Sequence, residues 1–250
     1  MNLISIIIPT KDRLKFLKRA VDSIIAQTYT NWELFIINDS KEDLLFSSCD
    51  TRIHKINNSN KPGANGARNT GIDLSTGKYI AFLDDDDSWH PTKLYKQVAI
   101  MDSGSALMCY SGRNIIIKKK NTIRYSYHSL IFSSSFTLFI HNYIGTTSSI
   151  LLRNKFNNNI KFDEKIILLQ DYDFYLSLAA KGEIVGLPEP LVNYYSDKSI
   201  KHISENNIFI FSSFWKIFLK QIWYKKLMII IPFIITILQK FYRNLYYKYI

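Results

Sequence analysis

The chain has 250 residues, enough to bury a sizeable hydrophobic core as one large domain or as one domain with an appendage. Hydrophobic residues make up 47% and charged residues 21%, with 9 glycines and 6 prolines, which excludes a disordered, collagen-like or low-complexity chain. The 2 cysteines exclude a disulfide framework and fit a reducing compartment, and much of the net charge of +11 lies in residues 201–250.

The first hundred residues alternate strand and helix patterns. Strands are predicted where β-branched and aromatic residues form short apolar runs, and helices where apolar residues recur at helical spacing. Asp12 is predicted to cap the first helix. Such alternation indicates βαβ units and a mostly parallel sheet. The predicted strands are residues 3–8, 33–37, 52–56 and 78–83, and the predicted helices are residues 14–25, 63–74 and 91–101.

The pattern is less regular after residue 101. A helix is predicted over residues 171–180, with Gly182 as its C-terminal stop. Beyond residue 207 the sequence is typical of a helix rich in aromatic and basic residues. Short strands are predicted at residues 106–110, 114–117, 150–152, 183–185 and 191–195.

Polar residues follow three of the predicted strands at the point where each ends. Pro9 and Thr10 follow the first strand, Asn38 and Asp39 the second, and residues 84–87 the fourth. Because ligands of parallel α/β sheets bind beyond the carboxyl ends of the strands, these three clusters predict one site at one sheet edge.

The strongest signal is the run of four aspartates at residues 84–87. Adjacent carboxylates repel each other unless a cation or hydrogen bonds compensate. Alternate residues of an extended segment share a face, so Asp84 and Asp86 can converge on a hard cation such as Mg²⁺. The alternative is a solvated acidic turn in which Asp87 or Ser88 caps the following helix.

Several motifs follow one another in order along the chain. They are S-I-I-I-P-T with Asp12-Arg13, S-I-I-A-Q-T-Y followed by W-E-L, Asn38-Asp39, G-x-x-x-A-R-N-x-G-I from residue 63, F-L-D-x-D-D-x-W from residue 82 with P-x-x-L, and L-L-Q-D-Y-D-F-Y-L from residue 168. In this order and spacing they resemble the motifs of family 2 glycosyltransferases, over about residues 3–195. The resemblance implies an α/β fold of the GT-A type, a nucleotide-sugar-binding fold with a central, mostly parallel sheet flanked by helices.

The same resemblance implies a donor nucleotide site. Asp39 would accept a hydrogen bond from the nucleobase imide, which suits uridine, and its alternative role is to cap the turn after the second strand. Arg68 would face the base and the diphosphate, where the alternative is a surface cation on an amphipathic helix. The implied donor-binding residues are Pro9, Thr10, Asp12, Arg13, Asp39, Arg68, Asp84 and Asp85.

Catalysis, by the same resemblance, needs a metal and a base. Asp86 would bind Mg²⁺ or Mn²⁺, which neutralises the nucleoside diphosphate as it leaves. Asp171 would be the general base that takes the proton of the acceptor hydroxyl, and its alternative role is a helix N-cap. Gln170 stands where the family often has Glu, and the absence of that charge should lower the pKa of Asp171.

The predicted function is transfer of a sugar, with inversion, from a nucleotide sugar, most simply a UDP-sugar, to a hydroxyl of a glycan or lipid-linked acceptor in cell-surface polysaccharide or lipopolysaccharide synthesis. One alternative is a sugar-phosphate nucleotidyltransferase, which would need a glycine-rich loop after the first strand, where Lys11 and Asp12 stand instead. The other is a non-catalytic membrane-surface binding protein. Nucleic acid is not an expected partner, because the basic residues lie among apolar runs.

The chain is predicted to divide into a catalytic domain, residues 1–200, and a helical, basic, apolar tail, residues 201–250. The tail carries eight basic residues and one acid, interleaved with aromatic residues, a pattern typical of a helix lying on an anionic membrane surface. Residues 227–238 form an apolar run too short to span a bilayer as a helix. The predicted location is the cytoplasmic face of the membrane, and the alternative is a tail that packs on the domain or forms a homodimer.

Overall fold

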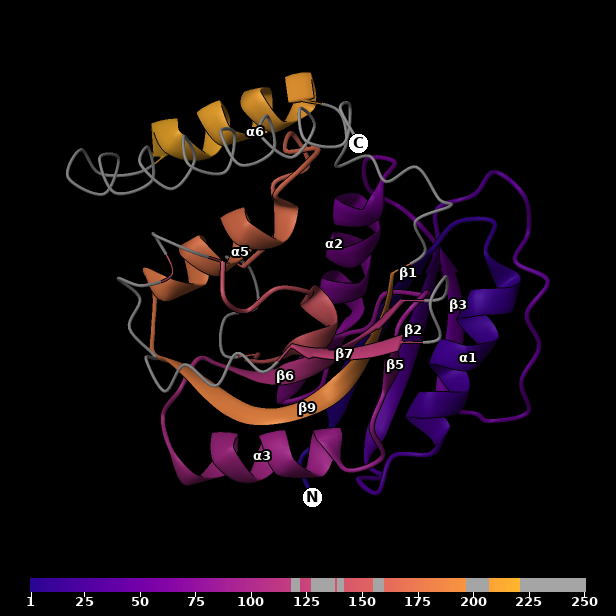
Figure 1. The fold of residues 1–250 in the computed structure, drawn as a ribbon. Helices are drawn as coiled ribbons and strands as arrows, with labels where there is room; N and C mark the ends of the chain where they lie inside the picture. Colours follow the sequence, from indigo (N-terminus) through magenta and orange to yellow (C-terminus); the bar gives the residue numbers. More distant parts are fainter. Residues whose placement is uncertain (118–121, 127–137, 139–141, 155–159, 197–206, 221–250) are drawn as a thin grey trace.

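The computed structural model describes residues 1–117, 122–126, 138, 142–154, 160–196 and 207–220 (Figure 1). Its strands are β1 (Ile4–Thr10), β2 (Trp32–Asn38), β3 (Ile53–Asn57), β4 (Tyr79–Phe82), β5 (Ser88–Trp89), β6 (Met108–Ile117), β7 (Thr122–Ser126), β8 (Ile150–Arg153) and β9 (Ile184–Ser196). Its helices are α1 (Leu14–Ile25), α2 (Ala64–Leu74), α3 (Lys93–Ser103), α5 (Gln170–Ala179) and α6 (Asn207–Lys220), with a 3₁₀ turn, η2, at Thr147–Ser149.

The first half of the sheet is parallel, as the sequence predicts. Strands β3, β2, β1 and β4 lie side by side in that order, and all three pairings are parallel. The register aligns Thr10 with Asn38, so β1 and β2 end level with each other. The polar residues that follow these strands therefore begin at one sheet edge.

The second half of the sheet corrects the prediction of a mostly parallel arrangement. From β4 the order continues β8-β6-β9-β5, with β7 on β6, and only the β6–β9 pairing in this half is parallel. The separate short strands predicted around residues 106–117 and 183–195 are two long strands, β6 and β9. Their shared ladder shifts register near Gly112, and β9 sweeps in a broad curve through the molecule (Figure 1).

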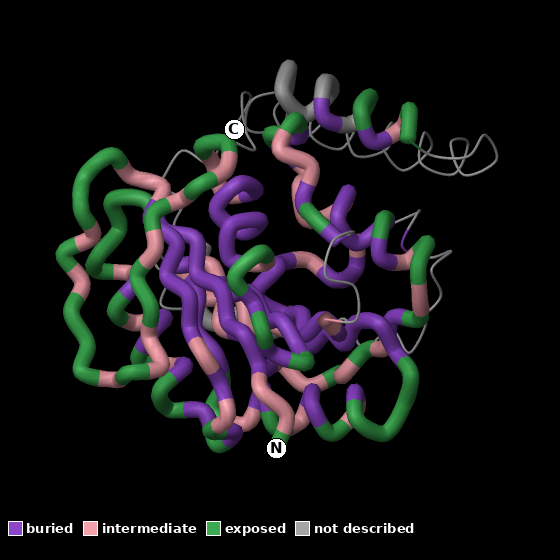
Figure 2. The backbone as a smooth tube through the Cα atoms, turned by 180° about the vertical axis from the view of Figure 1, so that it is seen from behind, coloured by how far each residue is buried: buried purple, intermediate pink, exposed green. Residues whose placement is uncertain are grey.

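Helices cover both faces of the sheet. Alternate residues of β1 point to opposite faces. Ile6 belongs to the core cluster that includes Leu17 of α1 and Leu94 of α3, whereas Ile7 belongs to the cluster that includes Ala67 of α2 and Phe174 of α5. The strands between these helices are the most continuously buried part of the chain (Figure 2). The core therefore has two layers, one on each face of the sheet. The carboxyl ends of the strands lie between these layers, where a ligand can bind.

The start of α1 differs from the sequence prediction. Arg13, not Asp12, occupies the N-cap position, and no side chain caps the helix. Asp12 has a left-handed backbone with φ of 55°, and its carboxylate accepts a hydrogen bond of 2.6 Å from Ser40 Oγ. Asp12 thus ties the loop after β1 to the loop after β2 instead of capping the helix.

The predicted tail is only partly described. Helix α6 lies above α5 in the view of Figure 1, and it is the only part of residues 201–250 within the described ranges. Residues 227–238 lie outside those ranges. No helix in the part of the chain that the structure describes is both long enough and apolar enough to cross a membrane.

Candidate active site

The three polar clusters meet at the carboxyl ends of β1, β2 and β4. The Asp39 backbone N–H donates to the Thr10 carbonyl at 2.9 Å, and Thr10 Oγ1 donates to Asp85 Oδ2 at 2.8 Å. These two bonds join residues that are far apart in the sequence. The polar residues that the sequence places at one sheet edge therefore meet in one cluster of contacts.

Asp39 lies at the end of β2 with most of its side chain covered. Its Oδ1 accepts from Asn58 Nδ2 at 2.7 Å, and its Oδ2 accepts from the Gly63 backbone N–H at 2.9 Å. Gly63 has φ of +123°, a conformation open to glycine, and it immediately precedes α2. Since a carboxylate oxygen can accept more than one hydrogen bond, Asp39 can hold this loop and still accept from a ligand.

The four aspartates alternate between two environments. The side chains of Asp84 and Asp86 are 28% and 31% exposed. Asp85 and Asp87 are buried. Asp85 and Asp86 lie in a turn that the Asp87 backbone N–H closes by donating to the Asp84 carbonyl at 3.0 Å, so the segment is not extended as the prediction assumes. Asp84 and Asp86 are nevertheless the two more exposed carboxylates of the four.

Asp84 joins α2 to η2. Arg68 Nη2 donates to Asp84 Oδ1 at 2.6 Å, and Thr147 Oγ1 donates to the same oxygen at 3.2 Å. Arg68 is itself buried and lies over the ring of Phe162, 5.3 Å from its centre. The alternative of a surface cation is therefore wrong, because Arg68 is an inward-facing partner of the acidic segment.

The two buried aspartates, Asp85 and Asp87, hold the acidic segment in place through hydrogen bonds. Asp85 binds Thr10 and also accepts from Arg13 Nη1 at 3.2 Å, and burial raises the pKa of its carboxyl to about 6. Asp87 accepts from Ser148 Oγ at 2.6 Å, and burial together with the Asp84 charge raises its pKa well above the ordinary value. Neither Asp87 nor Ser88 caps α3, whose N-cap is Thr92, so the simple capping turn is excluded.

The hydroxyl residues of η2 were not identified as site residues from the sequence. Ser148 Oγ accepts from the Asp84 backbone N–H at 3.1 Å while donating to Asp87, and the Ser148 carbonyl accepts from Trp89 Nε1 at 2.8 Å. In the sequence, residues 145–149 resemble a segment of the family that faces the acceptor, but by themselves they indicate only an ordinary polar turn. These contacts hold the acidic segment against a part of the chain about sixty residues later.

Asp86 is the acid available for a cation. Its Oδ2 accepts from Arg13 Nη1 at 3.0 Å, and its carbonyl accepts from Arg19, whose guanidinium stacks 3.6 Å from the centre of the Tyr195 ring. Burial, together with the charge of Asp84, raises the pKa of Asp86. Arg19 thus links α1, the acidic segment and β9, a role that nothing in the local sequence indicates.

Asp171 lies in the first turn of α5. Asn142 Nδ2 donates to its Oδ2 at 3.2 Å, and the Tyr172 backbone N–H donates to its Oδ1 at 2.9 Å. Burial raises the pKa of Asp171, the hydrogen bonds and Arg68 lower it, and Asp84 raises it. The charges of Arg68 and Asp84 therefore both act on the pKa of Asp171, in opposite directions. It is not the helix N-cap, a position held by Leu169.

The carboxylate oxygens of Asp84 and Asp86 suit a divalent metal ion that needs few protein ligands. Within the described ranges, no three His, Cys, Asp or Glu side chains gather as a complete metal site. Asp84 and Asp86 each offer a partly exposed carboxylate, and each already has a cationic partner, Arg68 for Asp84 and Arg13 for Asp86. Mg²⁺ and Mn²⁺ prefer such hard oxygen ligands, and Mg²⁺ commonly takes one or two carboxylates and completes its shell with water and phosphate.

Comparison with known proteins decides the family. The model of glycosyl transferase family 2 matches residues 5–165, which include every residue of the site so far described except Leu169, Asp171, Tyr172 and Tyr195. The chain belongs to glycosyltransferase family 2.

Similar proteins align with most of the chain. It is 28% identical over 230 residues to the amylovoran biosynthesis glycosyltransferase AmsB of Erwinia amylovora, covering 84% of this chain and 75% of AmsB. It is 33% identical over 190 residues to WfaP of Escherichia coli, a UDP-Glc:alpha-D-GlcNAc-diphosphoundecaprenol beta-1,3-glucosyltransferase, covering 73% of this chain and 72% of WfaP. It is also 28% identical over 202 residues to the putative teichuronic acid biosynthesis glycosyltransferase TuaG of Bacillus subtilis, covering 77% and 78%.

Two solved structures resemble this one in fold. The S. aureus TarS 1–349 structure in complex with UDP matches with a TM-score of 0.64 at 14% identity, covering 86% of this chain and 64% of that chain. The complex of the same protein with UDP-GlcNAc matches with a TM-score of 0.66 at 15% identity, covering 86% and 65%. This likeness supports the mixed α/β fold of the GT-A type, and this chain spans just under two thirds of the TarS chains.

Proposed function

We propose that this protein transfers a sugar, with inversion, from a UDP-sugar to a hydroxyl of a glycan or lipid-linked acceptor during cell-surface polysaccharide synthesis. The observation that carries the proposal is the Arg68–Asp84 ion pair at the acidic segment of a family 2 chain, whose two charges also act on the pKa of Asp171. A donor site and a base for the acceptor would then lie on two sides of one cluster.

The nucleotide half of the donor would lie at the ends of β1 and β2. Asp39 would accept the imide N–H of uracil, beside Pro9 and Thr10, which would line the base and ribose. The other proposed donor-binding residues are Asp12, Arg13, Arg68, Asp84 and Asp85. Asp85 accepts hydrogen bonds from Thr10 and Arg13 and so orients both side chains. Uridine is supported by the UDP complexes of TarS and by the UDP-Glc donor in the name of WfaP.

The diphosphate would lie over the exposed acidic face. Asp86 would hold Mg²⁺ or Mn²⁺, which supplies neutralisation of the charge that develops on the leaving nucleoside diphosphate. Because Arg13 now pairs with Asp86, this guanidinium must share or release that carboxylate when a cation binds. Arg68 would stay paired with Asp84, adding a fixed positive charge beside the phosphates.

Asp171 would act as the general base. Its raised pKa makes its carboxylate a stronger proton acceptor than an ordinary aspartate, while Asn142 and the Tyr172 N–H hold it in place. A base that takes the acceptor proton on the side opposite the diphosphate gives a single displacement and therefore inversion.

Membrane attachment through residues 201–250 is part of the proposal, at the cytoplasmic face where nucleotide sugars are available. The acceptor named for WfaP is linked to diphosphoundecaprenol, a lipid carrier. In the described part of this segment, Trp215 and Leu219 expose large apolar side chains. A homodimer through the same segment is the competing arrangement.

The test is a donor panel with the purified full chain. Release of UDP, GDP and dTDP from their glucose or N-acetylglucosamine conjugates is measured with a diphosphopolyprenyl-sugar acceptor, with Mn²⁺ and with EDTA. We expect UDP release that EDTA abolishes, and its loss in Asp86→Asn but not in Asp43→Asn, an exposed acid that serves as the charge-matched control. Nucleotide release that is unaffected by EDTA and by Asp86→Asn would refute the metal assignment.

A further inference from the structure

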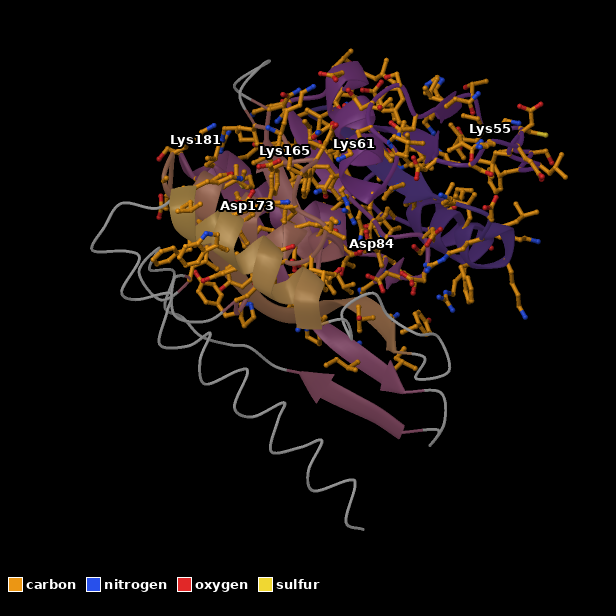
Figure 3. The ribbon with its side chains drawn as sticks, turned by 90° about the horizontal axis from the view of Figure 1, so that it is seen from above. Lys55, Lys61, Asp84, Lys165, Asp173 and Lys181 are labelled. Carbon is orange, nitrogen blue, oxygen red and sulfur yellow. The ribbon has the colours of Figure 1, made fainter. Side chains whose placement is uncertain are left out.

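Helix α6 is anchored on the segment that presents Asp171. Ser213 Oγ accepts from the Leu168 backbone N–H at 3.1 Å, and Lys216 Nζ donates to the Lys165 carbonyl at 2.7 Å. Ile217 is fully buried in the core that α2 and α5 share. The Asp173 and Lys165 side chains lie beside α6 in Figure 3. Although the sequence places α6 in the tail, these contacts join it to the catalytic domain.

Lys220 makes the strongest of these contacts. Its Nζ lies 2.7 Å from Asp163 Oδ2 and 3.0 Å from both carboxylate oxygens of Asp173. Asp173 is buried one half-turn beyond Asp171 on α5, and burial raises its pKa while Lys220 lowers it. Without Lys220 a buried carboxylate would lose its charged partner, an arrangement that favours movement of the helix carrying it.

The backbone between these anchors is strained. Leu169, at the N-cap of α5, has φ of 59°, a left-handed conformation that costs energy for a residue with a branched side chain. Such a conformation persists where its surroundings hold it. Here Ser213 binds the Leu168 amide on one side, and Lys220 holds Asp173 on the other. The strained residue lies two positions before Asp171.

The same segment is tied to α2. Asn65 Nδ2 donates to the Asp163 carbonyl at 2.8 Å, and Asn69 exchanges hydrogen bonds with the Phe162 backbone. These asparagines flank Arg68, the partner of Asp84. Residues 162–173 are therefore held between α2, which carries the donor-side arginine, and α6.

We infer that α6 positions the general base, and that Ser213 and Lys220 are positioning residues for Asp171. The inference rests on the proposed role of Asp171. On this inference the catalytic domain extends to residue 220. A chain that ends at the predicted boundary, residue 200, would lack the helix that positions the base.

The experiment measures transfer kinetics of the full chain with Lys220→Met and Ser213→Ala. Lys55→Met is the control, since Lys55 is an exposed lysine on β3, far from α6 (Figure 3). We expect Lys220→Met to lower kcat about tenfold or more, with the donor KM and the Kd for UDP within twofold of wild type. Ser213→Ala should lower kcat by a smaller factor, and Lys220→Arg should restore most of it. Lys55→Met should behave as wild type.

The double variant with Asp171→Asn separates positioning from general damage. If α6 acts through the base, Lys220→Met should lower kcat no further once Asp171→Asn is present. Additive losses, or a kcat within twofold of wild type for both Lys220→Met and Ser213→Ala, would overturn the inference while leaving the proposed function intact. Normal turnover of Asp171→Asn alone would overturn the assignment of the base and this inference with it. Should Lys220→Met not fold, Ser213→Ala carries the same comparison.

Discussion

Replacing Lys93 with methionine should stabilise the protein at neutral pH. Lys93 lies in the first turn of α3 with its side chain fully buried. Its ammonium donates to Gln97 Oε1 at 2.7 Å and lies 4.2 Å from the centre of the Trp89 ring. Burial lowers the pKa of Lys93 from 10.5 to about 7, with the Cys109 thiol opposing that shift. Methionine has a similar length and carries no charge into the core.

The magnitude follows from the pKa. One pKa unit corresponds to about 1.4 kcal/mol, so the cost of charging Lys93 in the folded protein has an upper limit of roughly 5 kcal/mol. Methionine loses the hydrogen bond to Gln97, worth about 1 kcal/mol, and the contact of the cation with Trp89, worth about 1–2 kcal/mol. A net gain of about 2 kcal/mol at pH 7 remains.

The effect has a defined pH dependence. Because the pKa of Lys93 is lower in the folded than in the unfolded state, the unfolded state binds more protons between pH 7 and about 10.5. The stability of the wild type should therefore rise with pH across this window, relative to the variant. The advantage of Lys93→Met should be greatest at and below pH 7 and should shrink toward pH 10.

Urea denaturation at pH 6, 7 and 9, followed by circular dichroism, measures these differences. Lys18→Met, at an exposed position on α1, is the control for an added methionine and a lost charge. A Lys93→Met protein that is less stable than wild type at pH 7, with an unchanged difference at pH 9, would show that the hydrogen bond and the aromatic contact outweigh desolvation.

Three further outcomes are expected. Arg13→Gln removes the guanidinium that competes for Asp86, so Mn²⁺ should bind several-fold more tightly by calorimetry, and equal or weaker binding would contradict this competition. Asp39→Asn removes a carboxylate acceptor, so the Kd for UDP should rise about tenfold or more, and an unchanged Kd would remove Asp39 from the base pocket. Trp215→Gln combined with Leu219→Gln should reduce flotation with liposomes of anionic lipid and leave UDP release unchanged, whereas undiminished flotation would place membrane binding elsewhere in the chain.

The fold could be predicted where the pattern is local. The apolar runs of β1, β2 and β4, separated by helices at regular spacing, predict a parallel arrangement because consecutive βαβ units repeat one geometry. The antiparallel direction of β8 relative to β4 cannot be predicted from local sequence, because it depends on pairing between strands some seventy residues apart. For the same reason the joining of short predicted strands into β6 and β9 was not visible in the sequence.

The site shows the same division. The greater exposure of Asp84 and Asp86 agrees with the prediction, but residues 84–87 form a hydrogen-bonded turn and not the extended segment from which it was argued. The Ser148–Asp87 and Lys220–Asp173 contacts join distant parts of the chain, and neither partner carries a local signal of the other. Asp12 failed as a cap because its backbone is left-handed and Ser40 binds its carboxylate.

The most direct test of the account is the turnover of Asp171→Asn with saturating UDP-sugar and acceptor. Asparagine keeps the shape of the side chain and cannot take a proton from the acceptor hydroxyl. We predict that kcat falls by about 10²–10⁴-fold while the Kd for UDP stays within twofold of wild type. Turnover within twofold of the wild-type rate would contradict the account, because the base would then lie elsewhere.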